Sequence, residues 1–253
     1  MLNFTKKIFL LYLVFNTGQS LHAQTFGFGC LGFVGGYGGF TYQKFNPVGF
    51  NEYIREFNLT EFVNTPVDEF SYAVGYRFGL NFFRATFENG IIVTAKGYYQ
   101  SINKKNKGGV GIGQSEDNYS LELSLKNWSL GFDVGWEFTK VVSWKILDGS
   151  LNFNNVTLTR SIDLPGEPTS INKYESDAGV IGYSIGTGVI VAILKDYISV
   201  EGLAGYTYLQ INNVYNSDES PTSFLETYNI NNKFIDSGGF TAVIQLNVGF
   251  PLL

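Results

Sequence analysis

The sequence predicts an all-β fold, a closed antiparallel up-and-down transmembrane β-barrel of about eight strands. Three observations lead to this prediction. Apolar and polar residues alternate with the period of a β-strand through most of the chain. The connections between these stretches alternate between short and long. The face opposite the large apolar residues is built mainly of Gly, Ala, Ser and Asn, whereas a strand face in water is usually rich in Lys, Glu and Thr.

The composition agrees with strands in an unusual environment. Charged residues make up 15% of the chain, against about 25% in ordinary soluble domains. Aromatic residues are abundant at 17%, and glycine is frequent as well.

The N-terminal residues 1–23 are typical of a secretory signal peptide, and we assign 24–253 to the barrel. Two lysines precede the apolar run 8–15, and a polar stretch follows that ends at Ala23, where we place cleavage, with Ser20 as the second choice. The apolar run is far shorter than the roughly 20 residues that a spanning helix needs. Because two lysines and no acid leave with this segment, the formal charge changes from −5 to −7. A chain this acidic is not expected to bind nucleic acid.

Turn-forming residues divide the remaining chain into strands. Short connections are predicted at 88–90, around 147–149 and at 194–196, and long ones at 44–68, 104–117, 163–176 and 211–236. Such an alternation is typical of an up-and-down sheet whose long loops all leave one end. The strands are expected at 26–43, 69–86, 91–103, 118–140, 150–162, 177–193, 197–210 and 237–250.

The stretch 118–140 breaks the alternation. Its apolar residues occupy odd positions from Tyr119 to Leu125 and even positions from Trp128 onward. Either a bulge near Lys126 and Asn127 shifts the register, or a tight turn lies there and the strand count rises to ten. We favour the bulge.

The two faces of the strands suggest which side meets lipid. In 70–82 every even residue is apolar, and the odd ones are Ser, Ala, Gly, Arg and Asn. Small side chains suit the narrow interior of an eight-stranded barrel. The bulky face then points outward, as in outer-membrane barrels with an apolar band and aromatic girdles. Closure of the sheet also satisfies the backbone hydrogen bonds, which hydrocarbon demands.

These features resemble the small outer-membrane β-barrel proteins of Bacteroidetes-type bacteria, which are similar in architecture to OmpX, OmpA and PorT. The resemblance rests on the signal ending in Ala23-Gln24, the Gly/Tyr-rich strands, the alternating loop lengths and the closing stretch 240–250. It implies a location in the bacterial outer membrane, contact with the lipid bilayer and lipopolysaccharide, and folding by the barrel-assembly machinery. The chain departs from the family pattern where Pro251-Leu-Leu253 follows Phe250, because such chains often finish on the aromatic residue.

Two glycine-rich segments have the spacing of nucleotide-binding loops, yet neither is expected to bind a cofactor. Residues 27–32 match a dinucleotide loop, with Glu52 as the distant acid, but they follow a cleavage site and continue into more Gly and Tyr rather than a helix. Residues 108–115 match a P-loop, except that Gln114 stands where the phosphate-binding lysine would be. We therefore predict no cofactor.

The sequence does not favour an enzyme. The barrel enzymes of this architecture rely on a histidine base, and His22, the single histidine, leaves with the signal. Asp133 and Glu137 lie four residues apart, about 13 Å along a strand, which is too far for glycosidase geometry. No metal site is predicted, because Asp218 and Glu219, which could offer oxygen ligands to a weakly held calcium, are better explained as solvated loop charge.

Several charged residues fall on faces that we assign to the barrel interior. Buried charges must be paired, so we expect a salt-bridge and hydrogen-bond network that fills the lumen. A structural plug is the favoured interpretation, and a gate or proton path is the alternative. The candidate residues are Arg77, Lys96, Asp133, Glu137 and Glu201.

The sequence favours a non-enzymatic outer-membrane barrel with surface loops that serve envelope integrity, adhesion or an accessory role in secretion. The alternatives are a narrow channel or small-ligand carrier, and a secreted soluble β-protein. The loop 44–68, which is acidic and aromatic, and the asparagine-rich loop 211–236 each offer a surface for a protein partner.

Overall fold

The computed structural model describes residues 35–60, 62–111, 118–194, 197–216 and 222–249. The predicted signal peptide, the glycine motif at 27–32, Gln114, the acids Asp218 and Glu219 and the C-terminal residues 250–253 lie outside these ranges.

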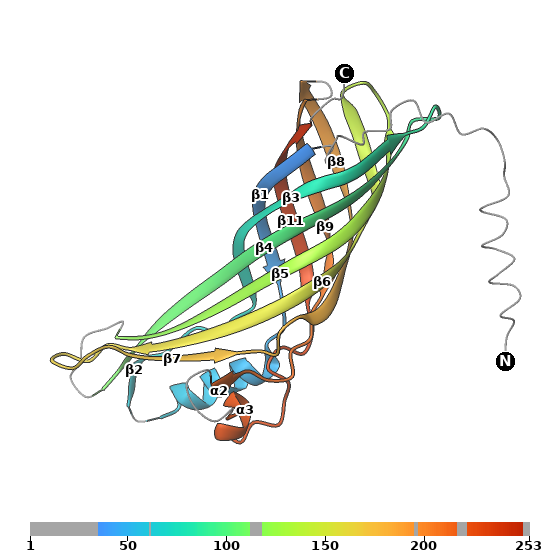
Figure 1. Ribbon diagram of the computed structural model, residues 1–253. Helices are drawn as coiled ribbons and strands as arrows, with labels where there is room; N and C mark the ends of the chain where they lie inside the picture. The colour runs from blue at the N-terminus through green and yellow to red at the C-terminus, as the bar shows by residue number, and fades with distance from the viewer. Residues whose placement is uncertain (1–34, 61, 112–117, 195–196, 217–221, 250–253) are drawn as a thin grey trace, which may run out of the picture.

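The chain forms a closed barrel of eight antiparallel strands, which confirms the predicted fold class and the smaller of the two strand counts (Figure 1). Each strand pairs with the next barrel strand along the chain, and the first strand pairs with the last, so the sheet has up-and-down topology. The strands are β1 (Gly35–Lys44), β3 (Tyr72–Thr86), β4 (Ile91–Val110), β5 (Tyr119–Glu137), β6 (Val142–Ile162), β8 (Val180–Leu194), β9 (Ile198–Tyr208) and β11 (Gly239–Gly249).

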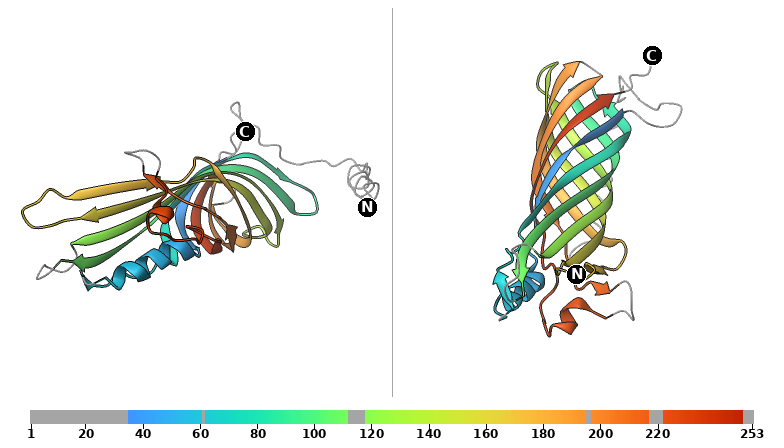
Figure 2. Two further views of the ribbon diagram at one scale, coloured as in Figure 1. Left: turned by 90° about the horizontal axis from the view of Figure 1, so that it is seen from below. Right: turned by 90° about the vertical axis from the view of Figure 1, so that its left-hand side faces the viewer.

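Three short connections lie at one end of the barrel, together with the start of β1 and the end of β11 (Figure 2). Two of them fall where the sequence places them, between β3 and β4 and between β8 and β9. The predicted turn around 147–149 is wrong, because the chain turns at 138–141 and β6 then runs through Asp148 and Gly149. The hydroxyl oxygen of Thr139 accepts hydrogen bonds from the backbone N–H groups of Val141 and Val142 and so closes this turn.

The predicted bulge near Lys126 and Asn127 is also wrong. Strand β5 pairs with β4 without interruption past these residues. Its odd positions face inward along the whole strand, and they change from apolar, ending at Leu125, to polar, beginning at Asn127. The outward face changes in the opposite sense, from Lys126 to Trp128. The inversion therefore marks a change of environment along an unbroken strand.

The longest strands continue past the barrel mouth as an open sheet, which we call the extension and which comprises residues 101–110, 119–126 and 155–162 (Figure 1). The predicted loop 104–117 is therefore too long at its start, since β4 ends at Val110. Three short strands pair with the extension or with each other: β2 (Val63–Thr65) with β4, β7 (Ser170–Glu175) with β6, and β10 (Tyr215–Asn216) with β7.

The long segments 45–71 and 209–238, which we call the cap, fold over the inner face of the extension (Figure 1). The long connections predicted at 44–68 and 211–236 fall largely in these segments, but they contain the helices α2 (Val48–Asn58) and α3 (Phe224–Thr227). Helix α2 buries Phe50, Tyr53 and Ile54, whose spacing places them on one side of a helix. No helix among the described residues is long and apolar enough to cross a bilayer.

The hydrophobic core lies between the cap and the extension rather than inside the barrel. Phe50 of α2 packs against Phe234, and Phe57 stacks on Tyr119 of β5 with ring centroids 4.5 Å apart. Tyr174 of β7 meets Phe224 of α3 edge-on at 5.0 Å. The apolar inward positions of β5 from Tyr119 to Leu125 complete this core.

One buried asparagine ties α2 to the start of β3. The side-chain amide of Asn51 donates to the carbonyl of Phe70 at 2.8 Å, and its oxygen accepts from the N–H of Phe70 at 2.9 Å. The two bonds satisfy both backbone groups of a residue that lies outside any regular element.

Candidate functional site in the barrel lumen

The outer wall of the barrel is apolar. Trp128, Leu130 and Phe132 on β5 expose 63%, 59% and 53% of their surface although the chain is folded. Many outward positions on the other strands are also large and apolar, including Phe40 on β1, Ile181 on β8 and Ile244 on β11. A soluble monomer rarely exposes a continuous apolar surface of this extent.

Two groups of aromatic side chains border this wall. At the cap side, which we call the cap-side ring, Tyr99 lies 5.2 Å from Phe78 and 5.0 Å from Trp128. At the short-turn side, the turn-side ring, Phe138 lies 4.8 Å from Trp136 and 6.1 Å from Trp144. Eight residues separate the two rings on β5, about 26 Å along a strand, or about 20 Å along the axis at the usual tilt of about 40°.

The lumen wall is polar. Asn127, Ser129 and Asp133 of β5 are buried inside the ring, and β6 adds Ser150, Asn152 and Asn154. Several of these side chains bond to one another across strands, as when the hydroxyl of Ser129 donates to the side-chain oxygen of Asn152 at 2.8 Å. The lumen is thus lined by hydrogen-bonding groups over the same length that the outer wall is apolar.

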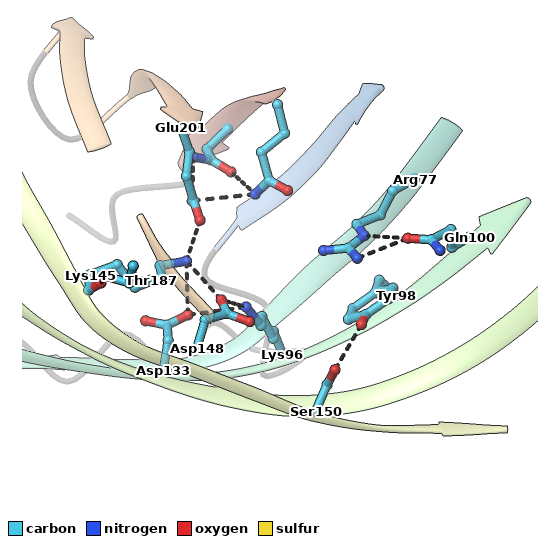
Figure 3. A network of polar contacts seen from close by, with 12 residues as sticks. Arg77, Lys96, Tyr98, Gln100, Asp133, Lys145, Asp148, Ser150, Thr187 and Glu201 are labelled. Carbon is cyan, nitrogen blue, oxygen red and sulfur yellow. Dashed lines mark hydrogen bonds and ion pairs between the residues drawn. The ribbon is translucent and has the colours of Figure 1, made fainter. Parts of the chain in front are cut away.

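A cluster of buried charges lies in the lumen (Figure 3). Lys96 and Asp133 belong to it and lie near the short-turn ends of β4 and β5. The amino group of Lys145 lies 3.1 Å from the carboxylate of Asp133 and 3.4 Å from that of Asp148, and it also pairs with Glu201. Lys96 pairs with Asp148 and lies 3.5 Å from Asp133. Four strands therefore meet in one network of two ammonium groups and three carboxylates, which we call the ion cluster.

The sequence prediction missed Lys145 and Asp148. They are three residues apart and would face opposite sides of a regular strand, but β6 carries a bulge between them that turns both inward. The hydroxyl of Thr187 on β8 donates to the carbonyl of Lys145 at 2.7 Å and holds the bulge in place. Alternation alone cannot reveal such a bulge, and the Asp148-Gly149 pair resembles a turn.

Three of the five predicted residues, Lys96, Asp133 and Glu201, lie in the ion cluster. Glu201 also accepts hydrogen bonds from the side chains of Gln245 at 3.3 Å and Asn247 at 3.1 Å. Glu137 does not join the cluster. It lies at the last residue of β5, half-buried beside the short turn, and forms no ion pair with the residues that the structure describes.

Arg77, the fifth predicted residue, lies beside the ion cluster in a neutral network (Figure 3). Its guanidinium donates twice to the side-chain oxygen of Gln100, at 3.1 and 2.8 Å, and lies 4.1 Å from the ring centre of Tyr98. The hydroxyl of Tyr98 bonds in turn to Ser150 at 2.8 Å. Among the described residues Arg77 has no carboxylate within ion-pair distance.

Some lumen groups have no hydrogen-bond partner among the described residues. The hydroxyls of Tyr37 and Thr41 and the side-chain oxygen of Gln245 are buried without a hydrogen bond. They lie on the neighbouring strands β1 and β11, where Gly39 faces Gln245. Polar groups placed in this way are usually satisfied by internal water, so we expect this side of the lumen to be hydrated.

The charges of the ion cluster are satisfied by each other, and no group of three or more His, Cys, Asp or Glu side chains in the described part of the chain is placed to hold a metal. The only histidine of the sequence is His22.

Comparison with models of known protein families gives no match, and comparison with the sequences of characterised proteins gives none either. Among solved structures, Ail, the attachment invasion locus protein of Yersinia pestis, is 13% identical, with a TM-score of 0.39 over 85% of this chain and 97% of its own. Neisserial surface protein A is 14% identical, with the same TM-score over 87% and 97%. The outer membrane protease OmpT of Escherichia coli is 9% identical, again at 0.39, over 86% and 94%. At this level of similarity the role of one protein does not carry over to another.

Proposed function

We propose that this chain is a non-enzymatic outer-membrane β-barrel protein whose lumen is closed by a structural plug. The observation that carries the proposal is the opposition of the two faces: the apolar wall between the aromatic rings points outward, and the ion cluster points inward. This arrangement is the reverse of a soluble barrel, whose apolar residues converge on the interior, and it is typical of barrels that cross the outer membrane.

The ion cluster supports a plug. Its side chains are held by several partners each, and charges buried in this way resist rearrangement because an unpaired charge is costly in a medium of low polarity. The cap covers the same barrel end from which the long connections leave. A narrow channel or small-ligand carrier is the second candidate, favoured by the unpartnered groups of Tyr37, Thr41 and Gln245.

The positions of the connections suggest an orientation. In outer-membrane barrels the short turns face the periplasm and the longer loops face the cell exterior. The cap then lies at the cell surface, where it serves envelope integrity, adhesion or an accessory role in secretion. Leu59 and Phe62, which follow α2, are 85% and 64% exposed and make the segment 44–68 the stronger candidate for a protein partner. Tyr53 of the same segment is buried and is not available for this contact.

The proposal includes the partners that such a location implies. The apolar wall would contact the lipid bilayer and lipopolysaccharide, and the barrel-assembly machinery would insert the chain. Membership of the Bacteroidetes-type barrel proteins remains part of this proposal and rests on the resemblance in sequence features.

Fractionation of cells that express the full chain tests the location. We expect the protein in the outer-membrane fraction, extractable only with detergent, with faster migration on a gel before heating than after it. A protein that stays soluble without detergent would contradict the proposal and favour a secreted soluble β-protein.

Planar-bilayer recording separates the plug from the channel. The purified full chain should insert without sustained current, because the ion cluster and the cap block the lumen. A steady single-channel conductance would support the channel instead, while leaving the outer-membrane location intact.

A further inference from the structure

The outward side of the strands beyond the cap-side ring carries a group of lysines. Beyond the cap-side ring, lysines at outward positions include Lys105 on β4 and Lys126 on β5, both in the extension, and Lys44 at the end of β1, outside it. Glu122 is the only acid at the described outward positions of these strands beyond the ring, and it pairs in register with Lys105. The face carries serine, asparagine and threonine between the charges.

The cap has the opposite charge. The described residues of its segments 45–71 and 209–238 contain six acids and two bases. Because the cap covers the inner face of the extension (Figure 1), the two faces of one sheet are sorted by charge. The basic face looks back along the outer wall of the barrel, toward the membrane surface, and the acidic cap lies on the side away from it.

Two of the lysines, Lys44 and Lys126, follow an interfacial order along their strands. On β1 the outward residues are Phe40, Tyr42 and Lys44, and on β5 they are Leu130, Trp128 and Lys126. An apolar residue, an aromatic residue and a cation thus succeed one another toward the cap. Aromatic side chains take the headgroup level in membrane proteins, so the ammonium groups lie at the level of lipid phosphates.

A groove beside Lys44 offers room for a lipid tail. It crosses β11, β1 and β3 on the outer wall, has a volume of about 600 Å³ and is bordered by Phe40, Tyr76 and Ile244. The groove is deep at Ala242, because this small outward residue of β11 lies between two large ones. The groove is continuous with the apolar wall, and its lining includes Tyr42, the outward residue that precedes Lys44 on β1.

We propose that the basic face, formed by Lys44, Lys105 and Lys126, binds the anionic, phosphate-bearing headgroups of the lipids in the leaflet on the cap side. This inference rests on the proposed outer-membrane location and deepens it by naming the contact residues. The anionic headgroups would attract these lysines and repel the acidic cap, and the two effects together would fix the tilt of the extension over the membrane surface. Each lysine near an anionic surface contributes roughly a five-fold preference.

The three tryptophans of the chain allow a direct test. Trp128 lies in the cap-side ring, two residues from Lys126, whereas Trp136 and Trp144 lie in the turn-side ring. The variant W136F/W144F therefore reports on the cap side alone, and W128F reports on the turn side. Each full-length variant is folded into phosphatidylcholine vesicles that contain either brominated phosphatidylglycerol or brominated phosphatidylcholine, both of which quench tryptophan.

We expect the quenching of Trp128 to show that phosphatidylglycerol is preferred over phosphatidylcholine near this residue by roughly five-fold or more at low salt. The preference should fall at high salt because screening weakens contacts at the surface. The added substitutions K105Q/K126Q should bring the preference for phosphatidylglycerol over phosphatidylcholine close to a ratio of one. The matched control K140Q, which removes an exposed lysine near the turn-side ring, should leave it unchanged. W128F should show no preference.

The outcomes distinguish this inference from the proposal beneath it. Quenching of Trp128 by both lipids without preference would overturn the headgroup contact and leave the transmembrane barrel intact. A preference for phosphatidylglycerol that survives K105Q/K126Q would overturn the assignment to the basic face. A preference that is equal at Trp128 and at the turn-side tryptophans would overturn it as well. Absence of quenching by either lipid would show that Trp128 does not face a bilayer, and both proposals would fail.

Discussion

Leu125 and Asn127 are consecutive residues on the inward face of β5. Leu125 nevertheless belongs to the hydrophobic core under the cap, whereas Asn127 belongs to the polar lumen. Nothing in the backbone separates them, because the pairing with β4 is regular through both residues. The outward face changes at the same level, from Lys126 to Trp128. In the proposed outer-membrane location the surface of the membrane would cross the strand at this level, because the side chains on each face suit water on one side of it and lipid on the other.

Phe132→Lys tests this boundary. Phe132 lies midway between the two aromatic rings and is 53% exposed, so the new charge would sit at the bilayer midplane. We expect the free energy of unfolding from lipid vesicles to fall by about 2–4 kcal/mol. Ser124→Lys, at an outward position of the extension, should change it by less than about 0.5 kcal/mol. Equal effects of the two substitutions would show that the boundary is misplaced.

Lys145→Met tests the plug. The substitution keeps a side chain of similar length but leaves the carboxylates of Asp133, Asp148 and Glu201 with one ammonium group instead of two. Removal of one member of a buried ion pair typically costs about 3–5 kcal/mol, and we expect a loss of this size in denaturant titrations of vesicles that contain the protein. Lys140→Met, in the exposed turn, is the matched control. A Lys145→Met barrel as stable as the control would argue against a structural plug.

The sequence predicts the barrel well because the pattern that defines it is local. Alternation along 70–82 and along 240–250 locates strands and separates their faces, and the lumen position of Asp133 follows from the same parity. Glu137 also occupies an odd, inward position, but it is the last residue of β5. Its distance from the ion cluster therefore depends on where the turn at 138–141 begins, which the alternation does not predict.

Two features of the structure are not local. The bulge that turns Lys145 and Asp148 to one side depends on contacts with both neighbouring strands and on the hydroxyl of Thr187. The cap depends on packing between segments far apart in the chain, such as Phe50 with Phe234. Helix α2 leaves a short periodic signal in Phe50, Tyr53 and Ile54, which is easily overlooked in a segment bounded by prolines.

Asn51→Ala should loosen the cap. The substitution removes two hydrogen bonds to the backbone of Phe70 and leaves a buried N–H and a buried carbonyl without partners, at a cost of about 1–3 kcal/mol for each group. We expect faster proteolysis in the segment 45–71 of the vesicle-bound protein, with the barrel strands still protected. Asn232→Ala, which removes an exposed hydrogen bond to Glu52, should leave the rate nearly unchanged. Equal rates for the two variants would show that Asn51 does not secure the cap.

The cap should open at alkaline pH. Burial raises the pKa of the Tyr119 hydroxyl, and the neighbouring Tyr53, whose hydroxyl lies 3.0 Å away, raises it further. Burial also raises the pKa of Tyr228, which accepts a hydrogen bond from Arg160 at 2.7 Å. A raised pKa means that the fold favours the neutral phenol. The stabilisation is therefore complete below the pKa of the unfolded chain, about 10, and is lost as the pH rises through the higher pKa of the folded state.

Near-ultraviolet circular dichroism of the vesicle-bound protein measures this opening, because the packed aromatic side chains of the cap give the signal. We expect the signal to decline above about pH 10 and the decline to move to higher pH in Tyr119→Phe, where the most strongly shifted hydroxyl outside the membrane is gone. Tyr206→Phe, on the outer wall and away from the cap, should titrate like the unmodified chain. If Tyr119→Phe opens at the same pH as Tyr206→Phe, the buried tyrosines do not control the cap, and its stability must rest on apolar packing alone.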